Sequence, residues 1–164
     1  MKRLKIYFDT SVINFLFADD APQLRDATIE FFENFVNTGK YEVYISDLVI
    51  TEIEATKDAE KRAQLLNVTE NYPIGFVDEQ QSTEIVILAD LYLKEGILPV
   101  KSKADAFHIA ICVVNQIDIL LTWNYKHLAN INRRRKITQV NIENNYLHPL
   151  EIITPFEVID DEES

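Results

Sequence analysis

The sequence is poor in the residues that cross-link or interrupt a chain. It contains one cysteine, three glycines and five prolines among 164 residues. The single cysteine, Cys112, excludes an intramolecular disulfide, and its apolar surroundings are typical of a small core side chain. There is no low-complexity linker or internal repeat to mark a domain boundary. We therefore expect one domain over residues 1–158 and an acidic C-terminal tail over residues 159–164.

Long apolar runs are also missing. No segment reaches the roughly 18 uninterrupted apolar residues of a membrane-spanning helix. The first five residues lead directly into a strand-like segment, and the apolar region of a signal peptide does not follow them. These features predict a cytoplasmic protein that is not bound to a membrane.

Positive charge is scarce as well. The chain has 16 basic residues and 27 acidic residues, which give a formal net charge of −11. This sign disfavours binding of nucleic acid by general electrostatic attraction. A metal ion would partly neutralise carboxylates gathered around it, so the acidic balance alone does not exclude such a substrate. The one compact basic run, residues 133–136, is explained equally well as the solvated start of a helix.

The sequence does contain short β-prone runs that alternate with helical periodicity. Strands are predicted at residues 4–8, 41–45, 73–77, 117–122 and 151–154. Helices are predicted at residues 10–17, 24–36, 47–56, 59–67, 81–95 and 102–115, whereas residues 132–146 fit no clear pattern. This rhythm predicts a mainly parallel sheet covered by helices on both faces, which is a three-layer α/β/α sandwich.

In such a sheet, ligands bind beyond the carboxyl ends of the strands. Asp9 follows the first predicted strand and Asn124 follows the fourth, whereas Asp118 is expected at the opposite end of the sheet. Asp is also a favoured N-cap and Asn a common turn residue, so position alone leaves both explanations open. Trp123 and Tyr125, beside Asn124, are better explained by packing than by stacking on a base.

Helical geometry separates two glutamates of the helix predicted at residues 47–56, for which Ser46 is the expected N-cap. At about 100° per residue, the apolar side chains span an arc of about 200° that includes Glu52 and excludes Glu54. A carboxylate directed at a core is costly unless it is paired or binds a metal ion. Glu52 is therefore expected to face a metal ion or a neighbouring lysine, and Glu54 to face water.

The helix predicted at residues 102–115 is apolar nearly all round, apart from Asp105 and His108. Asp105 lies in its first turn, near the expected site. However, Ser102 and Asp105 also fit a capping box, in which the acid bonds back to the cap residue. His108, one turn later on the same face, is better explained as a hydrogen-bonded core histidine than as a metal ligand.

The three acidic residues Asp9, Glu52 and Asp105 offer hard oxygen ligands without a cluster of cysteines or histidines, which favours Mg²⁺ or Mn²⁺ over zinc. Such ions keep several waters, complete their coordination on phosphate oxygens and promote phosphodiester cleavage. The sequence has no glycine-rich phosphate loop, G-x-S-x-G elbow or zinc-spaced histidine motif in support of another reaction.

Four segments carry a resemblance to a known family. In chain order they are Tyr7-Phe8-Asp9-Thr10-Ser11-Val12-Ile13-Asn14, Ile45-Ser46-Asp47-Leu48-Val49-Ile50-Thr51-Glu52-Ile53, Lys103-Ala104-Asp105-Ala106-Phe107-His108-Ile109-Ala110 and Leu120-Leu121-Thr122-Trp123-Asn124. In this order they resemble the PIN-domain family, especially the VapC-like ribonuclease toxins of prokaryotic toxin–antitoxin pairs. The resemblance implies a three-layer sandwich and an endoribonuclease that depends on Mg²⁺ or Mn²⁺. It also implies frequent homodimers and often a small antitoxin protein that blocks the site.

The resemblance assigns roles to particular residues of this chain. It implies that Asp9, Glu52 and Asp105 are catalytic metal ligands. It implies that Asn124 is a further catalytic residue and that Ser11 and Thr122 support the site. The position of Asn124 is commonly Asp in the family, and His127 stands where many relatives have another Asp. Both departures lower the negative charge available to a second metal ion.

Two other functions remain open. A catalytically weak or inactive PIN-like module that binds RNA or a protein through the same groove agrees with the acidic net charge and with Asn124. A phosphotransfer domain with Asp9 as nucleophile, as in haloacid-dehalogenase-like phosphatases, requires a second Asp two residues later, where this chain has Ser11. The acidic cluster is predicted from the residues, whereas RNA as the substrate comes from the resemblance.

Overall fold

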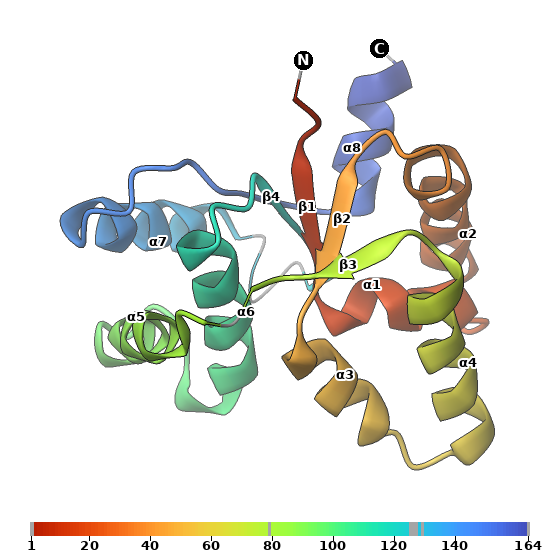
Figure 1. Cartoon of the computed structure of the whole chain (residues 1–164), viewed down its shortest axis with the longest axis horizontal. Coiled ribbons are helices and arrows are strands. Elements are labelled where there is room, and N and C mark those ends of the chain that lie inside the picture. The colour runs from red at the N-terminus through yellow and green to blue at the C-terminus, as the bar shows by residue number, and fades with distance from the viewer. Residues whose placement is uncertain (1, 79, 125–127, 129, 164) are drawn as a thin grey trace.

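The computed structural model describes residues 2–78, 80–124, 128 and 130–163. Its centre is a sheet of five parallel strands in the order β3-β2-β1-β4-β5 (Figure 1). The strands are β1 (Lys5–Phe8), β2 (Glu42–Ile45), β3 (Ile74–Phe76), β4 (Ile119–Leu121) and β5 (Glu151–Ile153). Each lies within a run predicted from the sequence, so the parallel sheet is confirmed.

Helices cover both faces of this sheet. The α-helices are α1 (Thr10–Asn14), α2 (Pro22–Phe31), α3 (Asp47–Glu54), α4 (Ala59–Asn71), α5 (Ser82–Lys94), α6 (Lys103–Val114), α7 (Ile131–Glu143) and α8 (Pro155–Glu163). Helices α5, α6 and α7 lie on one side of the sheet, and α1, α2, α4 and α8 lie on the other (Figure 1). The predicted three-layer α/β/α sandwich is therefore confirmed.

The strand order places a switch point between β1 and β4. From β1 the chain moves outward through β2 to β3, and then crosses to β4 and β5 on the other side of β1. In parallel sheets, the crevice beyond the carboxyl ends of the two strands at such a point is the usual ligand site. The segments that follow Phe8 and Leu121 begin there, and the Asp9 N–H donates to the Leu121 carbonyl over 3.3 Å.

The core is built around β1. Its residues Ile6, Tyr7 and Phe8 are fully buried, as expected for a central parallel strand covered on both faces. The Phe8 ring packs at 5.8 Å from the Phe31 ring and at 5.4 Å from the Phe32 ring. The segment that follows Phe8 is thus anchored to the buried centre of the sheet.

Three helices differ clearly from the predictions, and one of them, α4, extends to Asn71 and not to residue 67. The helix predicted at residues 24–36 begins at Pro22, which is favoured in a first helical turn, and it ends in a π-helical turn, η2 (Phe32–Val36). Residues 131–143 form α7, although their pattern is weak, because only a narrow stripe of this polar helix is buried. The Asn130 side chain accepts the first free N–H groups of α7 and fixes its start.

The basic run lies in the first turns of α7. Arg134 donates through Nη1 to the Ile152 carbonyl over 2.9 Å, on the edge strand β5. Arg135 and Lys136 are exposed. These positions agree with the solvated helix start considered from the sequence.

The last helix includes most of the expected acidic tail. Helix α8 runs from Pro155 to Glu163, and Val158 and Ile159 are buried. The packed region therefore continues past residue 158. No helix in the described parts of the chain is long and apolar enough to cross a membrane.

Asp118 lies at the opposite end of the sheet from Asp9, as predicted. Its Oδ2 accepts the Lys5 N–H over 2.8 Å, and its Oδ1 is 2.8 Å from Nε2 of His148. Asp118 thus holds the amino end of β1, at the end of the sheet opposite to Asp9.

Candidate active site

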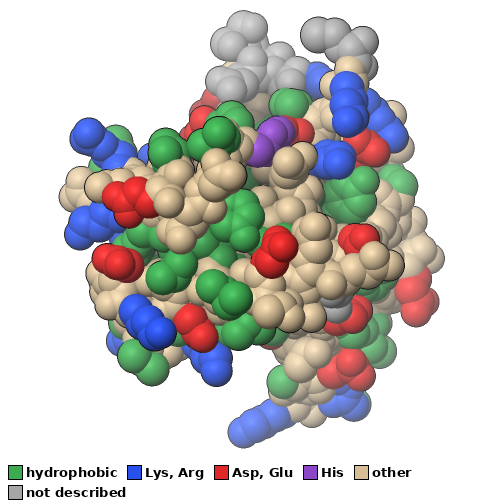
Figure 2. Space-filling model, turned by 60° about the vertical axis from the view of Figure 1, so that its left-hand side comes forward, with side chains coloured by type: hydrophobic (Ala, Val, Ile, Leu, Met, Phe, Trp, Pro, Cys, Tyr) green, Lys and Arg blue, Asp and Glu red, His purple; other side chains and the backbone are tan. Residues whose placement is uncertain are grey.

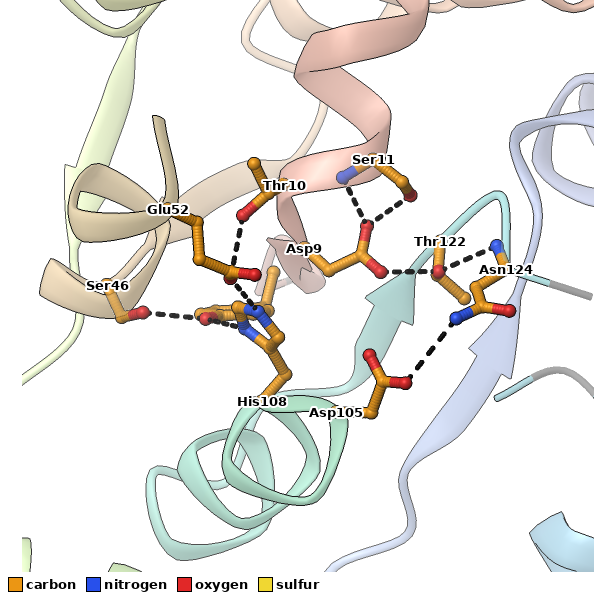
Figure 3. A network of polar contacts seen from close by, with 10 residues as sticks. Asp9, Thr10, Ser11, Ser46, Glu52, Asp105, His108, Thr122 and Asn124 are labelled. Atoms are coloured by element: carbon orange, nitrogen blue, oxygen red, sulfur yellow. Dashed lines mark hydrogen bonds and ion pairs between the residues drawn. The ribbon is translucent and has the colours of Figure 1, made fainter. Parts of the chain in front are cut away.

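The predicted acidic residues come from separate segments and meet at the switch point (Figure 3). Asp9 directly follows β1, Glu52 lies on α3, and Asp105 lies in the first turn of α6. Thr122 and Asn124 follow β4. In Figure 3, Asp9 lies between Glu52 on one side and the Thr122–Asn124 segment on the other, with Asp105 facing it from α6.

Asp9 is a buried carboxylate held by hydroxyl groups. Its Oδ1 accepts the Ser11 N–H (3.1 Å) and the Ser11 Oγ–H (2.5 Å), and its Oδ2 accepts the Thr122 hydroxyl (2.5 Å). Burial raises the pKa of Asp9 above its ordinary value, and the hydrogen bonds from the hydroxyls of Ser11 and Thr122 offset this only in part. The bond from the Ser11 N–H also makes Asp9 the N-cap of α1. Its capping role and its place in the site are therefore compatible.

Ser11 and Thr122 connect Asp9 to the segment after β4. Ser11 Oγ accepts the Trp123 N–H over 3.0 Å, and Thr122 Oγ1 accepts the Asn124 N–H over 3.0 Å. Each hydroxyl accepts a backbone proton and donates its own proton to one oxygen of Asp9. The backbone therefore fixes the direction of both carboxylate oxygens.

Glu52 points inward from α3, whereas Glu54 is exposed, as the helical periodicity predicted. The Glu52 side chain is 34% exposed. Its Oε1 accepts the Thr10 hydroxyl over 2.9 Å and lies 2.6 Å from Nε2 of His108. Burial alone raises the pKa of Glu52, but the bonds from His108 and Thr10 outweigh burial and hold the pKa below its ordinary value. Among the described residues, the hydrogen-bond partners of Glu52 are thus a histidine and a threonine, and none is a lysine.

Asp105 is not held by the capping box considered from the sequence. The Ser102 side chain makes no cap bond, and the Ser102 N–H donates to the Pro99 carbonyl over 2.8 Å. Instead, Oδ2 of Asp105 is 3.5 Å from the amide nitrogen of Asn124, at the long limit of a hydrogen bond. This contact joins α6 to the segment after β4 across the site.

Sequence reasoning missed the residues that hold Glu52. The Tyr7 phenol oxygen is 2.7 Å from Ser46 Oγ and 2.7 Å from Nδ1 of His108. Ser46 occupies the predicted N-cap position of α3, but its side chain makes no cap bond and contacts Tyr7. His108 is a buried, hydrogen-bonded histidine, as predicted. The only indication in the sequence that His108 contacts the site was its position one helical turn after Asp105.

The aromatic residues beside Asn124 are partly described. Trp123 is buried, donates through Nε1 to Thr28 over 2.9 Å and packs edge-on against Phe156 at 4.9 Å. The packing prediction for Trp123 is therefore confirmed. Tyr125 and His127 lie outside the described residues.

The chemistry of the donor set fits a hard divalent cation. Asp9, Glu52 and Asp105 supply carboxylate oxygens, and the raised pKa of buried Asp9 marks a negative charge that a cation would stabilise. Across the described residues, no three His, Cys, Asp or Glu side chains form a ready-made metal site. Mg²⁺ is usually bound through one or two carboxylates and keeps several waters.

The family model described as PIN domain matches residues 6–133, from β1 to the first turn of α7. The chain belongs to the PIN domain family. PIN domains are generally nucleases, so the family agrees with an acidic site at this edge of the sheet. The matched span includes Asp9, Glu52, Asp105 and Asn124. No curated protein matches this PIN domain.

Solved structures with a similar fold include two that contain VapBC proteins. One is VapBC2 from Rickettsia felis bound to a DNA fragment from their promoter, with a TM-score of 0.53 and 14% identity over 91% of this chain and 98% of that chain. The other is VapBC-1 from nontypeable Haemophilus influenzae, with a TM-score of 0.59 and 14% identity over 93% of this chain and 99% of that chain. At 14% identity this similarity shows a shared fold only. The shared fold covers more than nine-tenths of this chain.

Proposed function

We propose that this PIN domain is an endoribonuclease that requires Mg²⁺ or Mn²⁺ and hydrolyses RNA phosphodiester bonds. The observation that carries the proposal is the convergence of Asp9, Glu52 and Asp105 beyond the carboxyl ends of β1 and β4. Membership of a family whose members are generally nucleases supports the same reaction class.

The side chains of the site have two tasks in this proposal. Asp9, Glu52 and Asp105 would hold the ion, which when bound lowers the pKa of a water molecule and stabilises charge that develops on the phosphate. Ser11 and Thr122 keep both oxygens of Asp9 in fixed directions. Thr10 and His108 hold one oxygen of Glu52, Oε1, and Asn124 contacts one oxygen of Asp105, Oδ2.

A cleavage assay tests the proposal directly. The protein is incubated with structured and unstructured RNAs in Mn²⁺, Mg²⁺ or EDTA, after removal of any bound partner protein. Cleavage in a divalent ion and none in EDTA is expected. If no RNA is cut in any metal although the protein binds RNA, the catalytically weak or inactive PIN-like module is the better description.

The Thr122 hydroxyl is expected to matter because it is the donor to Oδ2 of Asp9. In Thr122→Val the shape is kept and the hydroxyl is lost, so one oxygen of Asp9 is no longer oriented. We expect cleavage to fall about 10-fold, at the lower end of effects seen when a partner of a metal ligand is removed. Thr122→Ser keeps the hydroxyl and should cut near the wild-type rate. Equal rates for both variants would contradict this role.

The acidic net charge gives a second prediction, on how RNA is bound. With a charge of −11, the protein has little general attraction for phosphate, so binding should depend mainly on the divalent ion. Affinity for an uncleavable RNA analogue, measured by fluorescence anisotropy, should fall in EDTA and change only weakly with KCl. A steep KCl dependence, with the same affinity in EDTA and in Mn²⁺, would contradict an ion-mediated contact.

We extend the proposal to a toxin that pairs with a small antitoxin protein in the cytoplasm. Its support is the fold shared with chains from the two VapBC structures and the resemblance of the four sequence segments. A short open reading frame immediately upstream of the gene is expected. Its product should bind the purified protein and suppress cleavage.

A homodimer is the second proposed partner. Two exposed apolar side chains, Val86 and Ile87, lie on α5. Another, Ile142, lies on α7, and Leu147 lies in the segment that follows α7. Figure 2, which brings forward the side of the molecule formed by these helices, shows hydrophobic side chains grouped among charges of both signs. Exposed apolar groups of this kind favour association. Sedimentation at micromolar concentration is expected to give the mass of two chains.

A further inference from the structure

A row of buried polar groups reaches Glu52 from the interior of the fold (Figure 3). It consists of Ser46, Tyr7 and His108, which come from the start of α3, from β1 and from α6, and all three are buried. Ser46 Oγ is 2.7 Å from the Tyr7 phenol oxygen, which is 2.7 Å from Nδ1 of His108. Nε2 of His108 is then 2.6 Å from Oε1 of Glu52. Three segments far apart in the sequence thus converge on one carboxylate oxygen.

The available partners fix the direction of the protons in this row. Within the described residues, the Tyr7 phenol oxygen is the only hydrogen-bond partner of Ser46 Oγ. A buried hydroxyl proton without an acceptor is unfavourable, so Ser46 donates to Tyr7. The Tyr7 proton must then go to Nδ1 of His108. A neutral imidazole that accepts at Nδ1 carries its proton on Nε2, where it is donated to Glu52.

Each of the two alternatives leaves at least one buried group unsatisfied. With protons on both ring nitrogens, Nδ1–H would donate to Tyr7, Tyr7 would donate to Ser46, and the Ser46 proton would have no acceptor among the described residues. With the single proton on Nδ1, the lone pair of Nε2 would face Oε1 of Glu52 at 2.6 Å. The phenol of Tyr7 therefore selects the form of His108 that attracts Glu52.

We propose that Tyr7 and His108 are positioning residues that orient the Glu52 carboxylate for the metal ion, which rests on the proposed function. His108 and Thr10 both donate to Oε1 of Glu52. The second oxygen is left to point toward the side on which Asp9 lies (Figure 3). Removing the hydrogen-bond partner of a metal ligand typically lowers metal affinity about 10–100-fold. Tyr7 has this effect without touching Glu52, because it acts through the tautomer of His108.

The proton order can be read in the metal-free protein, independently of cleavage. Long-range ¹H–¹⁵N NMR spectra of the wild type are expected to show His108 with a proton on Nε2 and none on Nδ1. In Tyr7→Phe, which loses only the phenol hydroxyl, a second population with the proton on Nδ1 is expected. A wild-type ring protonated on Nδ1, or on both nitrogens, would overturn the proposed order.

Metal affinity tests the positioning role. Mn²⁺ binding is measured by electron paramagnetic resonance for His108→Leu, His108→Gln and Tyr7→Phe, and thermal midpoints in EDTA report on folding. We expect His108→Leu to bind about 10-fold or more weakly, and Tyr7→Phe several-fold more weakly. His108→Gln should stay within about threefold of the wild type, because its amide can accept from Tyr7 and donate to Glu52.

Two results would overturn the positioning role. One is equal weakening by Leu and Gln at position 108, and the other is wild-type affinity in His108→Leu. If His108→Leu does not fold, wild-type affinity in Tyr7→Phe is the result that overturns it. Wild-type protein that binds no Mn²⁺ would refute the metal site of the proposed function, whereas the NMR experiment would still decide the proton order.

Discussion

Asp9→Asn is expected to lower RNA cleavage by roughly 10³-fold or more, as when one member of a catalytic group that acts as a unit is removed. Asn has nearly the same size and keeps an oxygen that can accept from Ser11, so the start of α1 should persist. The negative charge that would hold the ion is lost. We measure initial rates on one RNA in Mn²⁺ for the wild type and the variant.

The same substitution should change the stability of the metal-free protein only slightly. Burial raises the pKa of Asp9 above its ordinary value, so the ionised carboxylate disfavours the folded state at neutral pH, and a neutral amide removes this effect. The thermal midpoint of Asp9→Asn in EDTA should stay close to that of the wild type, because the gain from removing a buried charge offsets the lost acceptor of the Thr122 hydroxyl. Mn²⁺ should raise the midpoint of the wild type by mass action and leave that of the variant unchanged.

Asp118→Asn is the matched control at the other end of the same strands. Its carboxylate bonds the Lys5 N–H and His148, so the substitution should lower the thermal midpoint while cleavage stays near the wild-type rate. If Asp9→Asn cuts as fast as the wild type, the observed activity does not come from this site. If Asp118→Asn loses cleavage to the same degree, the loss reflects general damage to the fold.

Glu52→Gln is expected to reduce cleavage on the order of 10²-fold, and Glu54→Gln on the same helix to change it by less than about twofold. The amide at position 52 can still accept from Thr10 and His108, so the fold should be kept while the charge is lost. Glu54 is exposed, so its charged carboxylate faces solvent. Rates measured side by side with the same RNA and ion give the comparison.

Glu52→Gln and Glu54→Gln make the same chemical change on one helix and differ in the direction in which the side chain points. Both substitutions remove one carboxylate from α3 and keep the length of the side chain. A loss of cleavage caused by net charge or helix propensity would therefore appear in both variants. Similar rates for Glu52→Gln and Glu54→Gln would contradict the role given to Glu52. In that case, the inward direction of Glu52 would serve only the packing of the fold.

The strands and their parallel order could be predicted because the signals are local. Each β-prone run is short, apolar and followed by a helical period, which defines a parallel layered sheet with few alternatives. The inward direction of Glu52 followed in the same way from the positions of its neighbours on one helix. Only the start of helix α7 was considered from the sequence, because its buried stripe is narrow and its periodicity is weak.

The partners of the site could not be predicted because they are distant in the sequence. His108 and Glu52 are separated by 56 positions, and Tyr7 and His108 by 101. A capping box was a reasonable local expectation for Asp105, but the Pro99 carbonyl accepts the Ser102 N–H that the box requires. Which buried donor meets which acceptor depends on how the sheet brings β1, α3 and α6 together. Residue spacing within one helix carries no information on that.

Direct titration of Mn²⁺ into the metal-free protein tests the central claim, that Asp9, Glu52 and Asp105 form one metal site. Free Mn²⁺ is followed by electron paramagnetic resonance in the wild type and in Asp9→Asn, Glu52→Gln and Asp105→Asn, with Asp118→Asn as the control. We expect the wild type and the control to bind with the same affinity, and each of the three site variants to bind at least about 10-fold more weakly. Equal Mn²⁺ affinity in all five proteins, or no binding by the wild type, would contradict the claim.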